Sequence, residues 1–211
     1  MFKSPAYLVL AIGTDIGKTF FVCSALKKNP QIKAIKPVIS GFEYQENSDT
    51  IKILNAMGLE NNLKNIKKIS PWRFKKPLSP NFAGKVDYDS LMEFCQNSID
   101  KTKKANCKLL IEGAGGVLSP LTNQETFLDL AIDLKLPIIL ITSNYLGSIS
   151  HTISAIESIL NRHLKLSFII VNDNKNPPIS DKIFIKCLKK FIENKMTKFK
   201  IISLKNFLKK C

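Results

Sequence analysis

Apolar and polar residues are grouped along the chain in blocks of two kinds. Short continuous apolar runs bounded by turn-forming residues predict buried strands, and they lie at 6–11, 32–38, 109–111, 137–142, 166–171 and 199–202. Longer segments in which apolar residues recur every three or four positions predict helices, and they lie at 17–28, 49–57, 88–103, 127–134, 148–162 and 183–192. The stretch 59–87, which carries three prolines, is expected to be irregular.

The first apolar run leads into a turn of sequence Ala-Ile-Gly-Thr-Asp-Ile-Gly-Lys-Thr at 11–19, and a helix follows it. A strand, a glycine-containing turn that ends Gly-Lys-Thr, and a helix form the layout of a phosphate-binding loop, or P-loop. Backbone N–H groups in such a turn converge on phosphate oxygens, and the helix N-terminus adds partial positive charge. Lys18 would reach the β and γ phosphates, and the Thr19 hydroxyl would bind Mg²⁺.

This turn departs from the common P-loop pattern at one position. A glycine usually lies five positions before Gly17, and Ile12 occupies that place, so Gly13 would supply the flexible backbone instead. An ordinary strand-to-helix turn with a chance Gly-Lys-Thr is the alternative interpretation. The strand and helix that flank the turn favour the P-loop.

The order of the predicted elements indicates the fold class. Continuous apolar strands separated by helices are typical of a parallel sheet that is covered on both faces. We therefore predict a single domain over 1–211 with the three-layer α/β/α fold of P-loop NTPases and a mostly parallel central sheet. Ligands of such sheets bind beyond the carboxyl ends of the strands. Polar clusters follow the predicted strands at 13–19, 36–40, 112–116, 142–147 and 172–173.

Composition narrows the class of protein. Hydrophobic residues make up 45% of the 211 positions, yet no apolar run approaches the roughly 18–20 residues that span a membrane. We find no signal peptide ahead of the first strand. The five cysteines are scattered without a Cys-x-x-Cys pair, which favours free thiols, and only two histidines are present, which argues against a metal cluster. These observations predict a cytoplasmic protein with no membrane partner.

The formal net charge of +15 allows two interpretations. Lysines are spread along the chain, with local excess at 64–76, 101–108 and 186–210. Aromatic and basic residues are not interleaved in the way that single-strand binding favours. We therefore expect a solvated basic surface that also attracts anionic substrates, and no nucleic-acid partner. A polyanion partner is the alternative.

Further polar segments accompany the P-loop. Lys36 ends a predicted strand just before a proline, and Glu112 ends another just before a glycine-rich turn at 113–116 whose N–H groups could bind an anion. Asp49 begins a predicted helix, and 78–81 is a rigid polar turn of sequence Leu-Ser-Pro-Asn. Each charged residue also has a plain structural explanation: Lys36 as a surface residue, Asp49 as a helix N-cap, and Glu112 as a cap of the glycine turn.

Together these segments closely resemble the dethiobiotin synthetase family, in the same order, over roughly residues 6–175. That family carries a P-loop, then Lys-Pro-x-x-Ser-Gly, an Asp, Ser-Pro-x, Glu-Gly-Ala-Gly-Gly, Leu-Gly-x-x-x-His and a late Asn. The most specific matches are Lys-Pro-x-x-Ser-Gly at 36–41 and Glu-Gly-Ala-Gly-Gly at 112–116, both behind a P-loop. The last two motifs match 146–151 and 172–173.

The resemblance implies an ATP-dependent ligase of biotin biosynthesis. In that reaction 7,8-diaminononanoate and CO₂ form a carbamate, ATP phosphorylates the carbamate, and the second amine closes the ring to dethiobiotin, with release of ADP and phosphate. Cations must neutralise the charge that develops between carbamate and phosphate. The implied catalytic residues are Lys36, Lys18 and Thr14. The implied Mg²⁺ ligands are Thr19, Asp49 and Glu112.

The resemblance also implies binding residues. Asn172 would read the adenine edge. The implied contacts of ATP are Asp15, Ile16, Gly17, Lys18, Thr19, Phe20, Asp49, Glu112, Gly113, Ala114, Gly115, Asn172 and Asp173. The implied contacts of the diamine are Ser40, Leu146, Gly147 and Ser148. In the homodimer that the family predicts, the partner's 146–151 segment would hold the diamine's carboxylate, since backbone N–H groups at a helix start suit an anion.

The chain departs from the family pattern in three places. The family's loop usually reads Gly-Thr-Asp-Thr-x-x-Gly-Lys-Thr, and aligned without a gap Thr14 matches the second Thr and Asp15 an often acidic position. We prefer this alignment to a two-residue deletion because a shorter loop would spoil the phosphate cradle. The usual Gly-x-Ile-Pro segment near the nucleobase is missing, with 201–204 in its place, so base preference stays open. Tyr145 stands where many members carry a lysine.

A different class of protein is the alternative: a P-loop ATPase switch of the chromosome- or septum-positioning type, acting on DNA or membrane. Such proteins usually carry a second lysine early in the loop and an Asp-rich end of the third strand. This chain has Gly13 and the sequence Glu-Gly-Ala at 112–114 at those places. The two classes differ in whether ADP release requires the diamine, DNA or lipid.

Overall fold

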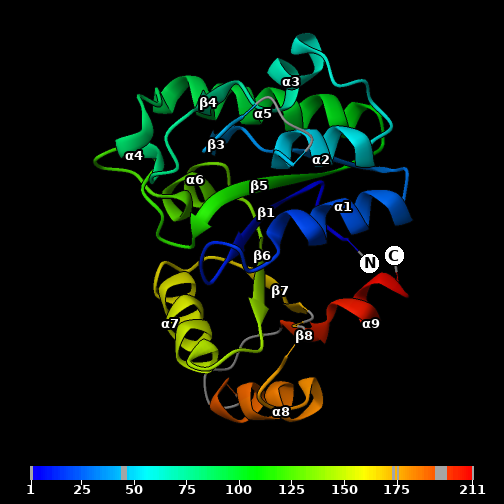
Figure 1. Ribbon diagram of the computed structural model, residues 1–211, viewed down its shortest axis with the longest axis vertical. Helices are drawn as coiled ribbons and strands as arrows, with labels where there is room; N and C mark the ends of the chain where they lie inside the picture. Colours follow the sequence, from blue (N-terminus) through cyan, green and yellow to red (C-terminus); the bar gives the residue numbers. More distant parts are fainter. Residues whose placement is uncertain (1, 44–46, 173, 175, 193–198, 211) are drawn as a thin grey trace.

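The computed structural model describes residues 2–43, 47–172, 174, 176–192 and 199–210, and six of its strands form one parallel sheet (Figure 1). Their order across the sheet is β2-β5-β1-β6-β7-β8, and every neighbouring pair is parallel. The strands are β1 (Ala6–Ala11), β2 (Ile32–Ile35), β5 (Lys108–Gly116), β6 (Ile138–Ser143), β7 (Leu166–Asn172) and β8 (Lys200–Ser203). All residues of β1 and β6 are buried, as expected of strands covered on both faces. The predicted fold class is confirmed.

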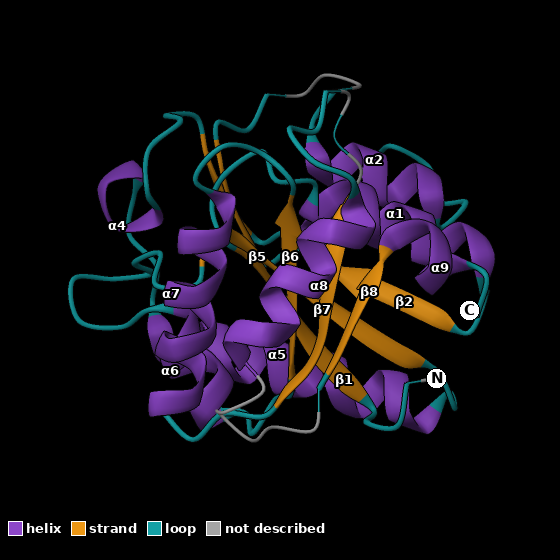
Figure 2. Ribbon diagram, turned by 90° about the horizontal axis from the view of Figure 1, so that it is seen from below, coloured by secondary structure: helices purple, strands orange, loops and turns teal. Residues whose placement is uncertain are grey.

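Helices cover both faces of this sheet. They are α1 (Lys18–Lys28), α5 (Tyr88–Lys104), α6 (Phe127–Asp133), α7 (Ser148–Asn161), α8 (Asp181–Ile192) and α9 (Leu204–Leu208). Figure 2 shows α1 and α9 on one side of the strands and α6 and α7 on the other. No helix within the described ranges is long and apolar enough to cross a membrane.

A smaller parallel sheet lies beside the main one. It consists of β3 (Val38–Ser40) and β4 (Trp72–Phe74), with α2 (Asp49–Ala56), α3 (Leu63–Ile69) and α4 (Pro80–Ala83) around it. The single strand predicted at 32–38 is therefore wrong. The chain leaves the main sheet at Lys36, whose N–H donates to the Ile69 carbonyl, and resumes as β3 after Pro37, which has no N–H to give.

Two further segments differ from the prediction. The stretch 59–87 is not irregular, because it contains α3, β4 and α4. These elements are too short, and too rich in polar residues, to show a clear apolar period. In α3, for example, the Asn62 side chain accepts from the Asn65 N–H and Ile66 is fully buried. The helix α9 was also not predicted. It begins at an N-cap Ser203 and holds a buried Phe207.

The strand predicted at 109–111 continues to Gly116, where a glycine-rich turn was expected. Glu112 pairs with Val9 of β1 and Gly116 with Ala11, so three residues of β5 lie against one of β1. This irregularity is a β-bulge, which bends a strand and redirects its side chains. The bulge brings the backbone of β5 next to the turn that leaves β1.

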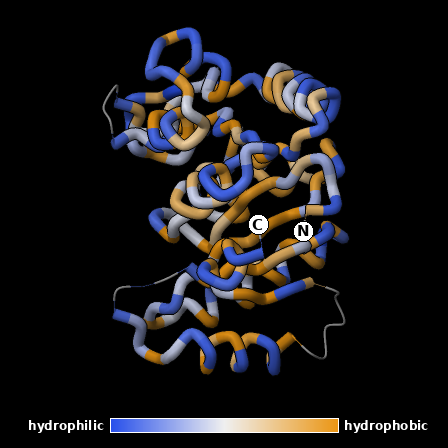
Figure 3. The backbone as a smooth tube through the Cα atoms, turned by 90° about the vertical axis from the view of Figure 1, so that its right-hand side faces the viewer, coloured by the Kyte–Doolittle hydropathy of each residue, from blue (hydrophilic) through white to orange (hydrophobic). Residues whose placement is uncertain are grey.

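The core is continuous from the sheet to the C-terminal helix. Figure 3 shows the apolar colour concentrated along the central strands and paler or polar colour on the outer turns. On the α9 side, Phe207 packs edge-on against Phe21 and Phe168, with ring centroids 5.2 and 5.6 Å away. Such pairs stabilise beyond the area that they bury. They fix α9 against α1 and β7.

Candidate active site

A cavity of about 1010 Å³ opens at the carboxyl ends of β1 and β2, where ligands bind in sheets of this type. Its walls come from the P-loop, α1, β3, α2, the 77–80 turn and the bulge of β5. Eleven predicted site residues line it: Thr14, Asp15, Gly17, Lys18, Thr19, Phe20, Lys36, Ser40, Asp49, Ala114 and Gly115. The structure therefore brings most of the predicted set to one place.

The P-loop is tied to β5 through its lysine. Gly17, the residue before α1, has φ +95°, a backbone conformation that L side chains rarely adopt. The buried Lys18 ammonium donates to the carbonyl of Gly115 at 2.7 Å and to that of Gly13 at 3.2 Å. Burial, with the nearby Lys36 charge, lowers the pKa of Lys18 to about 8. The lysine thus bridges the two backbone segments that flank the cavity.

Three charged side chains, two of which line the cavity, meet at its wall. The ammonium of Lys36 donates to Glu112 Oε1 at 2.8 Å and contacts the Asp49 carboxylate. Glu112 is fully buried, so its charge requires such a partner. Burial alone would lower the pKa of Lys36, but the two carboxylates outweigh it and hold the pKa above its usual value. Burial would likewise raise the pKa of Asp49, and Lys36 holds it below its usual value.

The parallel sheet explains why these side chains meet. Ile35 of β2 pairs with Ile111 of β5, so Lys36, just past the end of β2, and Glu112, within β5, lie at the same level of the sheet. The surface-lysine interpretation of Lys36 is wrong, because only 4% of the residue is exposed. Adjacent strands of one sheet thus deliver a cation and an anion to the same point.

The same cluster has the chemistry of a magnesium site. The Thr19 hydroxyl donates to Glu112 Oε1 at 2.6 Å, and Glu112 Oε2 is buried with no hydrogen-bond partner in the described part of the chain. No group of three or more His, Cys, Asp or Glu side chains that could hold a metal occurs among the described residues. Mg²⁺ does not need one, since it binds through one or two carboxylates plus phosphate and water oxygens. The set of Thr19, Asp49 and Glu112 therefore fits Mg²⁺.

Other cavity residues were not predicted from the sequence. Cys23 and Lys27 of α1 line the cavity, as do Lys52 and Asn55 of α2. The positions of Cys23 and Lys27 could have been found from the helical spacing, because residues four and eight positions after Thr19 lie on the same face of α1. Burial, together with the Glu112 charge, raises the pKa of Cys23 to about 11, so its thiol stays protonated at neutral pH. On the opposite wall, the hydroxyl of Ser40 is buried without a hydrogen-bond partner among the described residues.

Four predicted residues near the loop lie outside the cavity lining. Ile16, Glu112 and Gly113 are adjacent to lining residues but do not themselves line it. Asn172, at the end of β7, is also absent from the lining, and its amide N–H donates to the Ile16 carbonyl at 3.1 Å. Asp173 lies outside the described residues.

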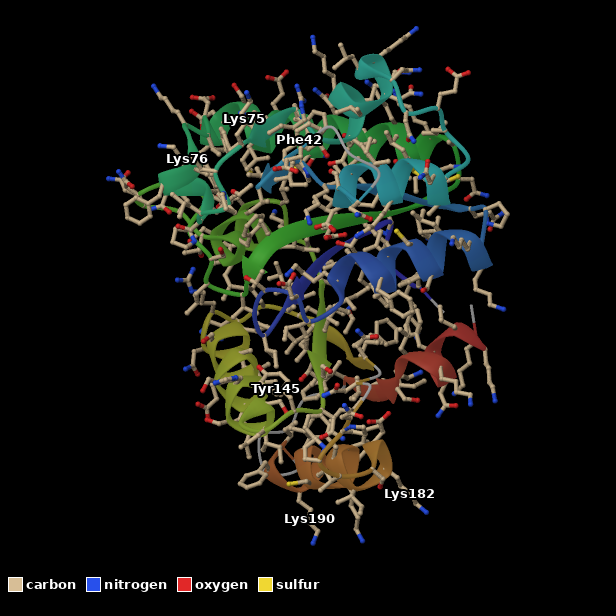
Figure 4. The ribbon with its side chains drawn as sticks, in the orientation of Figure 1. Phe42, Lys75, Lys76, Tyr145, Lys182 and Lys190 are labelled. Atoms are coloured by element: carbon tan, nitrogen blue, oxygen red, sulfur yellow. The ribbon has the colours of Figure 1, made fainter. Side chains whose placement is uncertain are left out.

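The segment predicted to hold the diamine's carboxylate is away from this cavity. Neither Leu146 nor Gly147 nor Ser148 lines it. Leu146 is 92% exposed, whereas Ser148 is buried and its hydroxyl donates to the Tyr145 carbonyl at 2.6 Å. In Figure 4, Tyr145 lies beside α7 in the lower half of the view, and Phe42, two residues beyond the end of β3, lies in the upper half. Within one chain these residues do not share a site with Lys36.

The fold and the P-loop define a P-loop NTPase domain. A family model described as "AAA domain" matches residues 5–203. The dethiobiotin synthetase of Caulobacter sp. (strain K31) is 33% identical over 84% of this chain and 80% of that protein. The enzyme of Phenylobacterium zucineum (strain HLK1) is 37% identical over 83% and 79%. The chain belongs to the dethiobiotin synthetase family.

Solved structures support the fold alone. A ParA family ATPase from Chlorobium tepidum superposes with a TM-score of 0.50 over 94% of this chain and 83% of that one, at 12% identity. That identity is too low to carry function. The resemblance in sequence is to synthetases, so the ATPase switch that the sequence left as an alternative is not favoured.

Proposed function

We propose that this protein is an ATP-dependent dethiobiotin synthetase. It would join 7,8-diaminononanoate and CO₂ to form dethiobiotin, with release of ADP and phosphate, in biotin biosynthesis. The observation that carries the proposal is the convergence of Lys36, Glu112, Asp49 and Thr19 beside a P-loop. The synthetases at 33% and 37% identity support the same activity.

The reaction proceeds in three steps. One amine nitrogen attacks the carbon of CO₂ and loses a proton, which gives a carbamate. A carbamate oxygen then takes the γ-phosphoryl group of ATP, and ADP leaves. The second amine attacks the carbamate carbon and loses a proton, the C–O bond to the phosphoryl group breaks, phosphate leaves, and the cyclic urea is formed. The middle step brings two anions together, so its barrier depends on the cations around the transferred group.

The chain supplies two of those cations, one from the start of α1 and one from the end of β2. Lys18, at the start of α1, would bind the β and γ phosphates in place of the carbonyls of Gly13 and Gly115 that it now contacts. Lys36 would act on the carbamate side of the transferred group. Mg²⁺, held by the Thr19 hydroxyl and the carboxylates of Asp49 and Glu112, would neutralise phosphate charge.

The remaining cavity residues would bind the substrates. Thr14 and the hydroxyl of Ser40, which has no hydrogen-bond partner in the described part of the chain, would hydrogen-bond the carbamate or the free amine. Asp15 and Phe20 would border the nucleotide at the P-loop, as would the backbone of 113–115 on β5. A nucleobase contact of Asn172 stays a prediction.

The turn before α7 would serve a second copy of the chain. We propose a homodimer in the cytoplasm, in which the partner's 146–148 segment meets the carboxylate end of the diamine. The support is the exposure of Leu146 and its distance from the cavity of its own chain, as Figure 4 indicates for the neighbouring Tyr145. Backbone N–H groups at the start of the fourteen-residue α7 suit a carboxylate.

ADP release measured with Mg-ATP and bicarbonate, with and without 7,8-diaminononanoate, tests the proposed activity. We expect release to require the diamine and dethiobiotin to appear in equal amount by mass spectrometry. ADP release that requires DNA or lipid instead, with no dethiobiotin, would contradict the proposal and revive the ATPase switch.

A further inference from the structure

Asn172 connects the far side of the sheet to the P-loop. It is the last residue of β7, which lies two strands away from β1 in the sheet order. Its amide nitrogen nevertheless reaches the loop and donates to the Ile16 carbonyl at 3.1 Å. The contact joins residues 156 positions apart, and Ile16 lies two residues before Lys18, the first residue of α1. Tertiary structure alone places it there.

The amide also packs directly against Gly17. A Cβ atom built on Gly17 would lie 2.0 Å from Asn172 Nδ2, far inside van der Waals contact. Gly17 also has φ +95°, a conformation that L side chains rarely adopt. Both its backbone conformation and the adjacent amide therefore exclude a larger residue at this point. Asn172 therefore packs directly against the turn that leads into α1.

The orientation of the amide is determined by its surroundings. Turning it over would place Oδ1 against the Ile16 carbonyl oxygen, and two acceptors repel each other. Oδ1 as it stands is buried and has no hydrogen-bond partner within the described chain. The donor group of Asn172 is thus committed to the P-loop backbone, and the residue does not line the cavity.

We infer that Asn172 is a positioning residue for the P-loop. It holds the Ile16 carbonyl and the Gly17 turn so that the N–H groups at the start of α1 keep the arrangement that receives phosphate. It therefore contributes to binding of any ligand that carries the phosphates, with or without a nucleobase. The inference rests on the proposed function in one respect, namely that phosphates bind this loop.

The test compares a ligand with a base and a ligand without one. Asn172→Asp retains the shape of the side chain but sets a carboxylate oxygen against the Ile16 carbonyl. Affinities of the full chain for ADP and for inorganic tripolyphosphate are measured by titration calorimetry in magnesium buffer. Loss of one hydrogen bond and the new repulsion should weaken the binding of tripolyphosphate about tenfold, and that of ADP by at least as much.

Asn174→Asp is the matched control. The Asn174 side chain also donates its amide N–H to a backbone carbonyl, that of Asn144 at 2.7 Å, but no contact with the P-loop is involved. The same change of amide to carboxylate at this position should leave both affinities within about twofold of wild type. Asn172→Ala removes the donor without adding charge, and a parallel loss for both ligands there excludes simple repulsion of phosphate.

Each other outcome overturns the inference. A loss confined to ADP would mean that Asn172 reads the base. Unchanged affinities in Asn172→Asp and Asn172→Ala, or an equal loss in Asn174→Asp, would mean that the contact does not position the loop. Wild-type protein that binds neither ligand would overturn the proposed function itself, and the inference with it. Thermal unfolding without ligand is recorded for each variant, and a loss that only tracks unfolding also counts against positioning.

Discussion

Two groups of polar residues at the carboxyl ends of the strands differ in what surrounds them. Lys36, Glu112 and Thr19 are joined by hydrogen bonds of 2.6 and 2.8 Å, and Glu112 is fully buried. The turn before α7 presents a leucine that is 92% exposed, and the hydroxyl of Ser148 is bonded inside the turn itself. One group is directed at a cavity of its own chain, and the other faces outward.

The difference shows which parts of an active site one chain can complete. Buried charges must be paired, so the cluster around Glu112 forms wherever the sheet folds. Leu146, which is 92% exposed just before α7, gains nothing in its own chain and would gain from burial against a second molecule. We therefore expect changes in the cluster to abolish chemistry, and changes in the turn to affect assembly and the diamine.

Lys36→Gln should have the largest effect. The variant loses the cation proposed for the carbamate side, and such a loss typically lowers the rate by about 10²–10³. Dethiobiotin formation should fall by that factor, while ADP affinity falls less than in Lys18→Gln, because Lys18 would contact ground-state phosphate. Circular dichroism and thermal unfolding control for the two carboxylates that the variant leaves without their ammonium. Near-normal turnover with the diamine would contradict the carboxylation mechanism.

Glu112→Gln should have the next largest effect. The amide retains the size of the side chain but removes a charged Mg²⁺ ligand, so the Mg²⁺ concentration for half-maximal activity should rise by about tenfold or more. Glu93→Gln is the matched control, because Glu93 is an exposed residue of α5 that does not line the cavity. A Mg²⁺ dependence that is the same in both variants would remove Glu112 from the metal site.

Most of the cluster was predictable because it follows from local rules. A residue near the carboxyl end of an apolar run in a parallel sheet lies close to the ligand-binding edge, which placed Lys36 and Glu112 together. The break at Pro37 that separates β2 from β3 was not predicted, since the apolar run continues across it. Nor was the bulge of β5, because register is a property of two strands and not of one.

Residues whose role depends on distant contacts were the least predictable. Asn172 contacts the P-loop only because β7 lies two strands from β1, and no pattern near it in the sequence indicates this. The short helix α3 depends on its Asn62 cap and two buried isoleucines, and α4 on a proline in its first turn, rather than on a long period. The separation of Leu146 from the cavity likewise required the whole sheet to be in place.

Leu146→Asp should have a smaller effect, confined to assembly and the diamine. Burying a leucine contributes about 1.5–3 kcal/mol, and a charge in its place opposes association. Light scattering should show a dimer for wild type and a monomer for the variant, with the KM for the diamine raised about tenfold and ADP affinity unchanged. Leu63→Asp is the control, because Leu63 is 60% exposed at the start of α3 and should leave the dimer intact. A fully active wild-type monomer would contradict the proposed role of this turn.

Added DNA should have the smallest effect on ADP release, and this prediction concerns the basic residues of the surface. The charge of +15 comes from 32 basic against 17 acidic residues, but Figure 4 shows Lys75 and Lys76 at one end of the molecule and Lys182 and Lys190 at the other. Charges distributed in this way do not form one track for a nucleic-acid backbone. Phosphate contacts of that kind release counterions and weaken steeply with salt, so any binding should vanish by about 150–200 mM salt.

Fluorescence anisotropy with a labelled duplex and an ADP-release assay with added DNA provide the measurement. DNA should neither replace the diamine nor raise the rate, because the cavity cluster is complete without a polyanion and the turn before α7 carries an apolar side chain outward. DNA binding that persists at high salt and stimulates ADP release would require a basic track that spans the two regions. The cluster around Glu112 and the turn before α7 would then bind one extended ligand together. The first could no longer be assigned to chemistry and the second to assembly.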